Sequence, residues 1–466
     1  MAHVAFAEFQ ARMQKTGLSA AAIRAFQHNY ETLTAGETGL IPESEIQAIS
    51  SLPHFEAIEK QVKPRQALLS QTVVIKLNGG LGTSMGLERA KTLLPVKNSL
   101  TFLDFIACQI LHLRQTHSVD LEFLFMNSFS TSRDTLEFLK KYPSLGRPDS
   151  LELMQGQVPK IDAKTLGPAF WPENPQFEWC PPGHGDLYPS LLGSGWLARF
   201  LHAGVRYAFV SNSDNLGASL DPKLLTWFAE SEKSFLMEVA ARTASDRKGG
   251  HLAQRKGRFL LRESAQCPES DLSFFQDIER HRFFNTNSLW IRLDRLNDLL
   301  TRQGGFIPLP LIKNRKTVDA RNKNSPAVIQ LETAMGAAIE CFDDSAAVVV
   351  PRSRFAPVKT TSDLLTLRSD AYRVTNDWRL LLDDAAGEQP PTIDLDPEHY
   401  KLVDQLDEKI AAGVPSLKYC KQLTIRGPVC FNSQNVFCGR VTIKNNGPAS
   451  KDLPAGEYKD TAIDLK

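Results

Sequence analysis

The sequence lacks the features that mark several specialised classes of protein. It has almost no net charge, since 54 Lys and Arg residues balance 53 Asp and Glu residues. Proteins that bind nucleic acids or membrane surfaces usually carry a basic excess. No apolar run approaches the roughly 20 residues that a membrane-spanning helix needs, and the first residues do not resemble a signal peptide. We therefore expect no nucleic acid and no membrane among the partners of this chain.

The sequence is also poor in cysteine. Its seven cysteines are an odd number and include no CxxC pair. A disulfide framework needs paired cysteines, and a cysteine zinc site usually needs closely spaced ones. The simplest interpretation is a reduced, cytoplasmic protein without a cysteine zinc site.

A length of 466 residues predicts two or three domains. Phe6, Phe9 and Met13 fall at helical spacing, so residues 1–65 are expected to form a helical N-terminal region. Residues 66–383 alternate strand-like runs, such as TVVIKL and YAFVSN, with helical periodicity, as in LTFLDFIACQILHLRQ. This alternation predicts an α/β core with a mixed, mainly parallel sheet, in which ligands sit at the carboxyl ends of strands.

The tail, residues 384–466, has a different pattern. It begins with a segment rich in acid and proline, which is interpreted as a linker. Short β-like runs then recur between Gly, Pro and Asn turns: LTIRG, VCFNS, VFCGR and VTIKN. Such repetition favours a small C-terminal β-helix domain.

The strongest local motif is IKLNGGLGTSMGLERAK, where a strand runs directly into a glycine-rich loop that ends at Lys91. Glycines let the backbone approach phosphates and cradle their oxygens. A Walker A loop needs a glycine before its lysine, and a Rossmann fingerprint needs its third glycine one residue earlier than Gly86. The LxxGxGTxxG loop of sugar-nucleotide pyrophosphorylases fits better. A purely structural glycine turn is the competing interpretation.

Other candidate residues stand beside predicted strand ends and loops. Asp214 follows a buried strand, where a carboxylate is costly unless it is paired or metal-bound, so it is a candidate Mg²⁺ ligand. His184 lies in PPGHGDL and could donate to a base, ribose or phosphate. Asn285, in FFNTNSLW, carries an amide that suits sugar hydroxyls. Turn, cap or core roles are the structural alternatives for all three.

Two further segments carry charge. Glu332 is expected to open a helix of small residues in QLETAMGAAI. Arg352, Arg354 and Lys359 cluster in a proline-marked loop that suits a phosphate clamp, although such a loop is often only solvated surface.

Taken together, these segments resemble the UTP–glucose-1-phosphate uridylyltransferase (UDP-glucose pyrophosphorylase) family of the type first known from eukaryotes. The matching stretches occur in the family's order between about residues 70 and 372. They are KLNGGLGTSMG, LTFLDF, MNSFSTSRDTLEFL, PPGHGDLYPSL, FVSNSDNLGASLD, FNTNSLW, QLETAMGAAI and PRSRFAPVKTTSDLL. One departure is Arg89-Ala90-Lys91, where the family commonly has Gly-Pro-Lys.

The resemblance implies a GT-A-like, Rossmann-like nucleotidyltransferase core and a C-terminal β-helix domain through which the family makes oligomer contacts. It implies the reversible reaction of UTP with α-D-glucose 1-phosphate to give UDP-glucose and pyrophosphate, with Mg²⁺. A phosphate oxygen of the sugar phosphate would attack the α-phosphorus of UTP in line, while Mg²⁺ and lysines offset the repulsion between the two anions.

The resemblance also implies roles for individual residues. The residues expected to hold uridine and its phosphates are Leu77, Asn78, Gly79 and Gly80. Gln155 would read the uracil edge, and Gly183 and His184 would line the nucleotide and sugar-phosphate pocket. Asn212 would serve the ribose and Asp214 the metal, while Asn285 and Glu332 would hold glucose hydroxyls. Lys91 and Lys359 would be the catalytic lysines at the phosphates.

Three other functions compete with this one. A uridylyltransferase for N-acetylhexosamine 1-phosphates typically has Arg-Leu in its loop, where this chain has Ser84 and Met85, but an enzyme for many sugar phosphates fits the motifs almost as well. A non-catalytic sugar-nucleotide sensor would have no need of Asp214 and both lysines. A nicotinamide dehydrogenase is disfavoured by the position of the third glycine.

Overall fold

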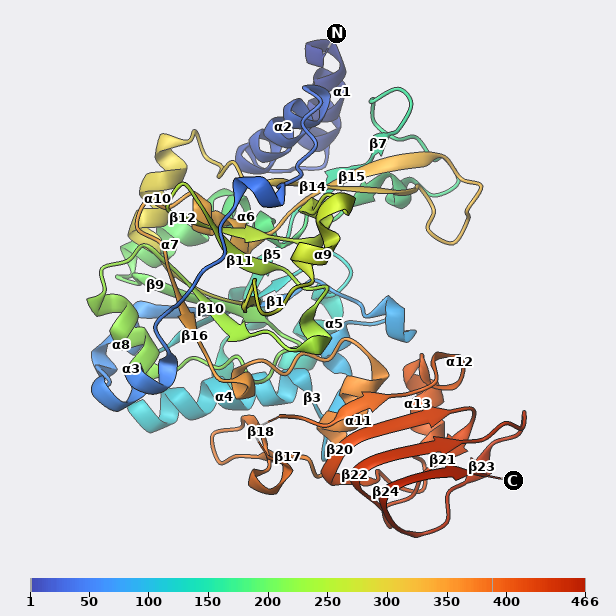
Figure 1. The fold of residues 1–466 in the computed structure, drawn as a ribbon. Coiled ribbons are helices and arrows are strands. Elements are labelled where there is room, and N and C mark those ends of the chain that lie inside the picture. The colour runs from blue at the N-terminus through green and yellow to red at the C-terminus, as the bar shows by residue number, and fades with distance from the viewer. Residues whose placement is uncertain (1, 388, 466) are drawn as a thin grey trace.

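The computed structural model describes residues 2–387 and 389–465, and within them a nine-stranded mixed sheet forms the centre of the molecule (Figure 1). The order of seven strands is β12-β11-β13-β9-β1-β4-β5, and β10 and β16 join beyond β13. The bounds are β1 Thr72–Asn78, β4 Glu122–Asn127, β5 Glu152–Met154, β9 Tyr207–Asn212, β10 Phe235–Ala241, β11 His251–Arg255, β12 Arg258–Arg262, β13 Phe283–Arg292 and β16 Ala346–Val349.

The strands that carry the predicted motifs are parallel. β1 pairs in parallel with β4 on one side and β9 on the other, and the register sets Leu77 opposite both Met126 and Asn212. β13 is antiparallel to β9 and to β10, which makes the sheet mixed. The glycine-rich loop after β1 and the Asp214 loop after β9 therefore leave the same edge of the sheet, as predicted.

Residues of β1 alternate between two hydrophobic cores, one on each face of the sheet. Val74 packs with α4 and α8, whereas Val73 and Ile75 pack with α6, α7 and α10. The β-branched side chains of this strand suit such a doubly covered sheet. The helices are α3 Phe55–Gln61, α4 Phe102–His117, α5 Ser132–Leu139, α6 Leu187–Gly193, α7 Trp196–His202, α8 Pro222–Glu230, α9 Leu272–Phe275 and α10 Leu293–Arg302.

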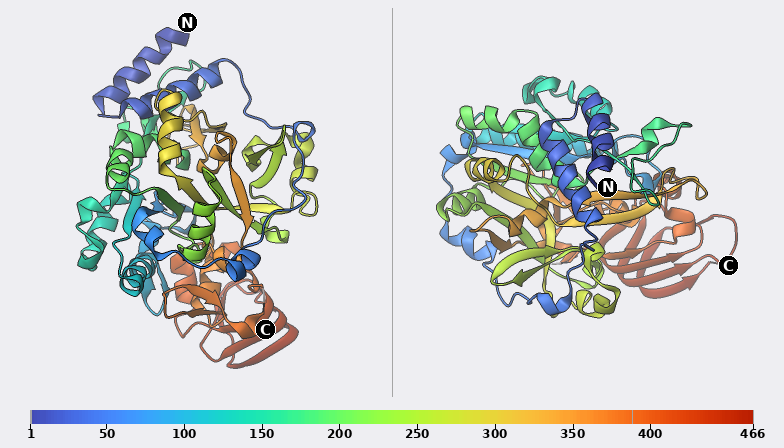
Figure 2. Two further views of the ribbon diagram at one scale, coloured as in Figure 1. Left: turned by 90° about the vertical axis from the view of Figure 1, so that its left-hand side faces the viewer. Right: turned by 90° about the horizontal axis from the view of Figure 1, so that it is seen from above.

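The N-terminal region begins as predicted and then departs from a helix. Two helices, α1 Ala2–Lys15 and α2 Ala20–Thr34, pack through Phe9 and Phe26, but the chain after Thr34 runs across the surface as an extended segment before α3. The two helices cover a small three-stranded sheet, β14-β15-β7, at the end of the molecule opposite the C-terminus (Figure 2). The bounds are β7 Ile161–Asp162, β14 Leu311–Thr317 and β15 Ala327–Thr333.

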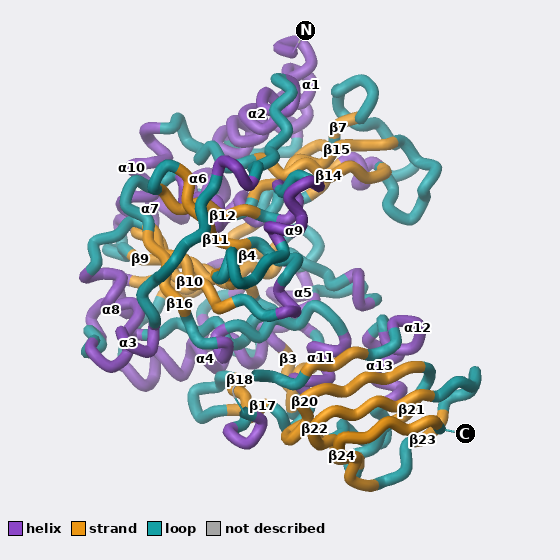
Figure 3. Tube along the Cα trace, in the orientation of Figure 1, coloured by secondary structure: helices purple, strands orange, loops and turns teal. Residues whose placement is uncertain are grey.

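The C-terminal region forms a separate parallel sheet of order β19-β20-β22-β24 (Figure 3). The runs VFCGR and VTIKN join into the single strand β22, and the segment interpreted as a linker supplies β19 and α12. Parallel pairing with inward Leu423, Ile425 and Val441 gives this sheet a hydrophobic interior. The elements are α11 Thr361–Arg368, α12 Pro397–Tyr400, α13 Val403–Lys409, β19 Thr392–Asp394, β20 Ser416–Arg426, β21 Val429–Cys430, β22 Asn435–Lys444, β23 Lys451–Asp452 and β24 Gly456–Asp464.

The remaining strands are short pairs, namely β2 Pro95–Lys97 with β3 Leu100–Thr101, β6 Val158–Pro159 with β8 Trp179–Cys180, and β17 Tyr372–Val374 with β18 Leu380–Leu382. Within the described residues, no helix has both the length and the apolar character to cross a membrane.

One local prediction was wrong. Glu332 does not open a helix but lies within strand β15, where it pairs with Ile312, and the small residues form a 3-10 helix only from Met335. The segment VIQLET is almost continuously buried within the strand, and Ala334 separates the strand from the 3-10 helix.

Candidate active site

A cavity of about 240 Å³ opens at the carboxyl ends of β1, β4 and β9. Most of the predicted site residues line it, together with three residues that the sequence analysis did not single out. The lining residues are Leu77, Asn78, Gly79, Gly80, Lys91, Thr92, Met126, Gln155, His184, Asn212, Ser213 and Asp214.

The glycine-rich loop owes its path to the absence of side chains. A Cβ on Gly79 would lie 2.7 Å from Oε1 of Gln155, and Gly82 has a φ of 73°, which side chains disfavour. The backbone N–H of Lys91 donates back to the carbonyl of Gly80 at 3.2 Å. The loop therefore presents bare backbone to the cavity and places a lysine at its far end.

The side chain of Asn78, at the end of β1, fixes the start of this loop through hydrogen bonds. Its amide nitrogen donates to Oδ1 of Asn127 and to the hydroxyl of Thr135, both at 2.8 Å, and its oxygen accepts from the hydroxyl of Thr92. The side chain is 3% exposed. Asn78 thus holds β1, α5 and the loop together, and what it offers a ligand is its backbone.

Gln155 faces the glycine loop with a fixed amide. Its Nε2 donates to the carbonyl of Gly183 at 3.0 Å, which turns Oε1 toward Gly79. Gly183 has a φ of 80°, and a side chain there would collide with the backbone of Thr333. Buried Asp186 accepts from the N–H of Gly156 at 2.7 Å and holds this segment in place. An amide in this setting can read the edge of a planar base.

His184 lines the cavity as a neutral donor. The backbone N–H of Met335 donates to its Nδ1 at 2.9 Å, so the ring carries its proton on Nε2. Burial lowers the pKa of His184 to about 4. A neutral imidazole of this tautomer can donate one hydrogen bond to an oxygen of a bound ligand.

Lys91 and Asp214 meet at the opposite side of the cavity. Nζ of Lys91 lies 2.7 Å from Oδ2 of Asp214 and also donates to the carbonyl of Val358. The Lys91 ammonium is thus a cation bound to the Asp214 carboxylate. Its two contacts connect the glycine-rich loop to the loops that carry Asp214 and Val358. Among the described residues, no three His, Cys, Asp or Glu side chains gather into a metal site by themselves.

Lys359 and Asn285 do not line this cavity, and the structure brings a carboxylate near them. Glu263, the residue that follows β12, lies near both of them, while the Asn285 amide donates to Oδ1 of Asn287 at 2.9 Å. Burial raises the pKa of Glu263, while the positive charge of Lys359 and the nearby Asn285 side chain oppose that rise. The three residues form a polar group of one cation, one amide and one carboxylate.

Comparison with known proteins connects this geometry to a family. A family model described as UTP–glucose-1-phosphate uridylyltransferase matches residues 23–438. The chain belongs to this family, whose members are nucleotidyltransferases. It is 39% identical to the UTP–glucose-1-phosphate uridylyltransferase of Solanum tuberosum over 391 residues, which cover 84% of this chain and 80% of that protein. Its identity with the protein of the same name from Encephalitozoon cuniculi is 37% over 409 residues, 88% of this chain and 80% of that one.

Solved structures agree with the sequence relatives. The UDP-glucose pyrophosphorylase of Leishmania major, described in open and closed structures, is 49% identical, with a TM-score of 0.95 over 99% of each chain. A variant of that protein in complex with UDP-glucose matches equally well. A UDP-glucose phosphorylase from Trypanosoma brucei is 48% identical, with a TM-score of 0.91 over 99% of this chain and 100% of that one. The uridylyltransferase fold therefore covers the whole described chain.

The structure distributes the predicted site residues of this uridylyltransferase family member over two places. Those from the nucleotide motifs converge on the cavity, whereas Asn285 and Lys359 stand at the Glu263 group. Glu332 lies beside Gly183, on the nucleotide side. Met126 and Ser213 lie within motifs and Thr92 adjoins one, so all three could have been found from the sequence. Glu263 lies in no motif, and only the fold brings it near Asn285.

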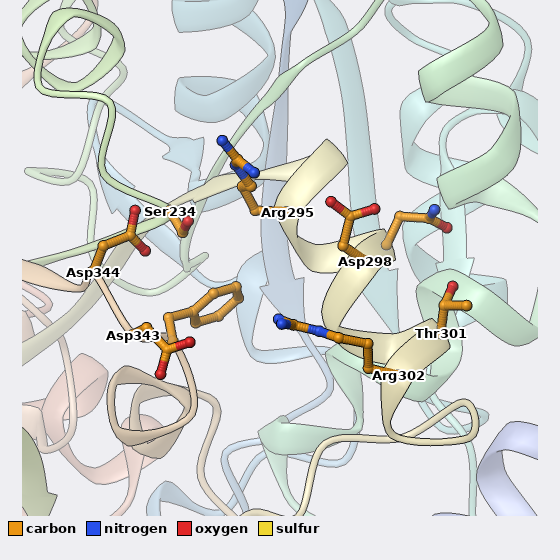
Figure 4. A pocket seen from close by; sticks show the side chains of 9 residues that line it. Ser234, Arg295, Asp298, Thr301, Arg302, Asp343 and Asp344 are labelled. Atoms are coloured by element: carbon orange, nitrogen blue, oxygen red, sulfur yellow. The ribbon is translucent and has the colours of Figure 1, made fainter.

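A second hollow, beside α10, is lined by both signs of charge (Figure 4). Arg295, Asp298 and Arg302 come from α10 and face Asp343 and Asp344 of another loop. Asp343 is already paired with Arg258 at 2.8 Å. This hollow has no glycine-rich loop and contains none of the predicted site residues, so it is not the candidate site.

We expect His184 to stay neutral, with its proton on Nε2, between about pH 5 and 8, because its pKa lies below that range. Long-range nitrogen–proton NMR spectra would identify the tautomer, and loss of the signal in a His184→Gln variant would assign it. A His184 resonance that moves with pH across this range would contradict the expectation.

Proposed function

We propose that the chain catalyses the reversible conversion of UTP and α-D-glucose 1-phosphate to UDP-glucose and pyrophosphate, the reaction for which its family is named. The observation that carries the proposal is the convergence on one cavity of the glycine-rich loop, the oriented Gln155 amide, the neutral His184 donor and the Lys91–Asp214 pair. Base, phosphate and metal each have a complementary group in this arrangement.

The nucleotide binds with its uracil against the glycine loop and the edge of the Gln155 amide. The amide of Gln155 has both a donor and an acceptor, as does the pairing edge of uracil. Backbone N–H groups of Gly79 and Gly80 face the phosphates, and His184 donates from Nε2 to a phosphate or ribose oxygen. Asn212 lies across the cavity at the end of β9, where we place the ribose.

Asp214 is the residue that would hold Mg²⁺. Its carboxylate already has a cation, the Lys91 ammonium, at 2.7 Å, so the position suits a positive charge. Magnesium takes carboxylate and phosphate oxygens and keeps several waters, so one protein carboxylate is a sufficient anchor. When bound, Mg²⁺ would neutralise phosphate charge, and Lys91 would then be released from Asp214 to contact the triphosphate.

The chemical step needs positioning more than acid–base catalysis. A phosphate oxygen of glucose 1-phosphate forms a bond to the α-phosphorus of UTP, the bond to the bridging oxygen breaks, and the electron pair leaves with pyrophosphate. No proton is transferred. Lys91 and Lys359 reduce the repulsion between the two anions, which is severe in a site shielded from water.

We place the sugar at the Glu263 group. The Asn285 amide and the Glu263 carboxylate offer a donor and acceptors to sugar hydroxyls. Glu332, on the nucleotide side, is a less direct partner for glucose than the family resemblance implies. The GT-A-like class of the core, the β-helix class of the C-terminal sheet, oligomer contacts through that sheet and the cytoplasmic location stay predictions.

Pyrophosphate release from the purified protein tests the proposal. With Mg²⁺ and glucose 1-phosphate, we expect release with UTP and little release with ATP, GTP, CTP or dTTP. A second panel with galactose and N-acetylglucosamine 1-phosphates would define the range of sugars. No release from folded protein with any of these nucleotides would overturn the enzyme and favour a sugar-nucleotide sensor.

A further inference from the structure

Two loops that carry proposed site residues leave distant strands of the central sheet. The loop at 213–219, with Asp214, follows β9, and the loop at 350–360, with Lys359, follows β16. β13 and β10 lie between these strands, so the sheet alone separates the two loops by three strand spacings, roughly 14 Å. Other contacts must therefore bring Asp214 and Lys359 to the same reaction centre.

Asn215 makes the contacts that join the loops. Its Nδ2 donates to the carbonyl of Arg354 at 3.1 Å, and its Oδ1 accepts from the N–H of Ala356 at 2.9 Å. The side chain is 1% exposed. The backbone of Asn215 forms a β-bridge with Pro357, and the N–H of Val358 donates to the carbonyl of Asp214 at 3.2 Å. The buried amide of Asn215 thus forms hydrogen bonds with both a backbone donor and a backbone acceptor of the loop that carries Lys359.

The loops are also packed against each other without a gap. A Cβ on Gly217 would collide with the carbonyl of Ser353. Below them, Arg354 donates to both oxygens of Glu238 on β10, at 2.7 and 2.8 Å, and to the carbonyl of Ser219 at 2.9 Å. Arg354 and Glu238 are buried, so their ion pair fixes the two loops at the sheet. Farther from the sheet, the contacts of Asn215 set how the two loops meet.

We propose that Asn215 is a positioning residue that sets the distance between Asp214 and Lys359 at the reaction centre. The proposal rests on the proposed function, because it assumes that Lys359 acts on the transferred phosphate. Asn215 itself faces the Lys359 loop, does not line the nucleotide cavity, and is assigned no contact with substrate.

Replacing Asn215 with alanine is expected to lower kcat about 100-fold, the effect of misplacing a reacting group by about 1 Å. The proposed binding of UMP uses Gln155 for the uracil and His184 for a phosphate or ribose oxygen, so the affinity for UMP, measured by calorimetry, should change less than about threefold. Asn215→Asp keeps the size and the acceptor but loses the donor, and it replaces the alanine variant if that variant does not fold. An unchanged kcat in either folded variant would overturn the proposal.

Asn445 provides a matched control. It is also a buried asparagine, 3% exposed, whose Nδ2 donates to the carbonyls of Pro428 and Ala449 at 2.6 and 2.8 Å, but it lies in the C-terminal sheet region. Asn445→Ala should lower thermal stability without lowering kcat. An equal loss of kcat in this variant would show that Asn215 acts only through stability and would overturn the proposal.

A double variant decides whether Asn215 acts through Lys359. If it does, Asn215→Ala should slow the reaction little further in a Lys359→Ala background, because the group that it positions is already absent. If the two substitutions instead lower kcat by factors that multiply, the positioning role of Asn215 is overturned, while the proposed function stands. The same holds if Asn215→Ala is fast and Lys359→Ala is slow. A fast Lys359→Ala enzyme would overturn the proposed role of Lys359 as well.

Discussion

Replacing Lys359 with alanine is expected to lower kcat by about 10³-fold, which corresponds to about 4 kcal/mol of lost transition-state stabilisation. The lysine lies near enough to Glu263 for its charge to lower the pKa of that carboxyl, and we place the sugar phosphate there. Its positive charge would offset the approach of two anions, whose repulsion grows as the bound substrates displace water. Single-turnover measurements at saturating UTP and glucose 1-phosphate would isolate the chemical step from binding.

The fold should tolerate this change. The side chain of Lys359 is exposed, and the bond of this residue to α11 comes from its backbone N–H, which donates to Asp363 at 2.8 Å. Thermal unfolding should therefore match that of the unmodified protein. Lys421→Ala, at an exposed position of β20, is a suitable control and should retain full activity. A Lys359→Ala rate within a few-fold of the unmodified protein would refute the assigned role.

Replacing Asp214 with asparagine is expected to lower kcat/KM by about 10³-fold at a fixed, moderate Mg²⁺ concentration, since a bound metal contributes several kcal/mol to such reactions. The change keeps the size of the side chain and removes its charge. It also removes the negative partner of Lys91, whose bond to the Val358 carbonyl is unaffected by the change. Excess Mg²⁺ should restore part of the lost rate, because the substrate phosphates still bind the metal.

The measurement is a Mg²⁺ titration of the rate, together with Mg²⁺ binding to the enzyme saturated with UDP-glucose, followed by calorimetry. Both half-saturation concentrations should rise in Asp214→Asn. Asp343→Asn is a matched control, because Asp343 also pairs with a basic residue, Arg258, but does so in the exposed hollow beside α10. Unchanged Mg²⁺ dependence in Asp214→Asn would show that the metal is held elsewhere.

Several parts of the site could be predicted because their chemistry is local. The glycine-rich loop is recognisable since only glycine tolerates its backbone and close contacts, as at Gly79 and Gly82. Asp214 stands out because a carboxylate at the end of an apolar strand is costly without a partner, and the structure supplies Lys91. The parallel pairing of β1 with β4 and β9 followed from the alternation of apolar strands with helices along the chain.

Other parts could not be predicted from the sequence. Glu332 was placed in a helix because small residues follow it, but cross-strand pairing with β14 decided otherwise. Asn78 carried a predicted binding role, yet its amide is used by Asn127, Thr135 and Thr92, which only the packing of α5 against β1 brings together. Propensity and motif describe short segments, whereas these outcomes depend on residues far apart in the chain.

The sequence by itself determined which segments bear chemistry, and its ordered motifs identified the uridylyltransferase family and the α/β class of the core. The tertiary structure decided how those segments work together. It set the tautomer of His184 through Met335, paired Lys91 with Asp214, and joined the Asp214 and Lys359 loops through Asn215. The physical reason is that hydrogen bonds and ion pairs act over about 3 Å, so residues more than a hundred positions apart interact only after folding.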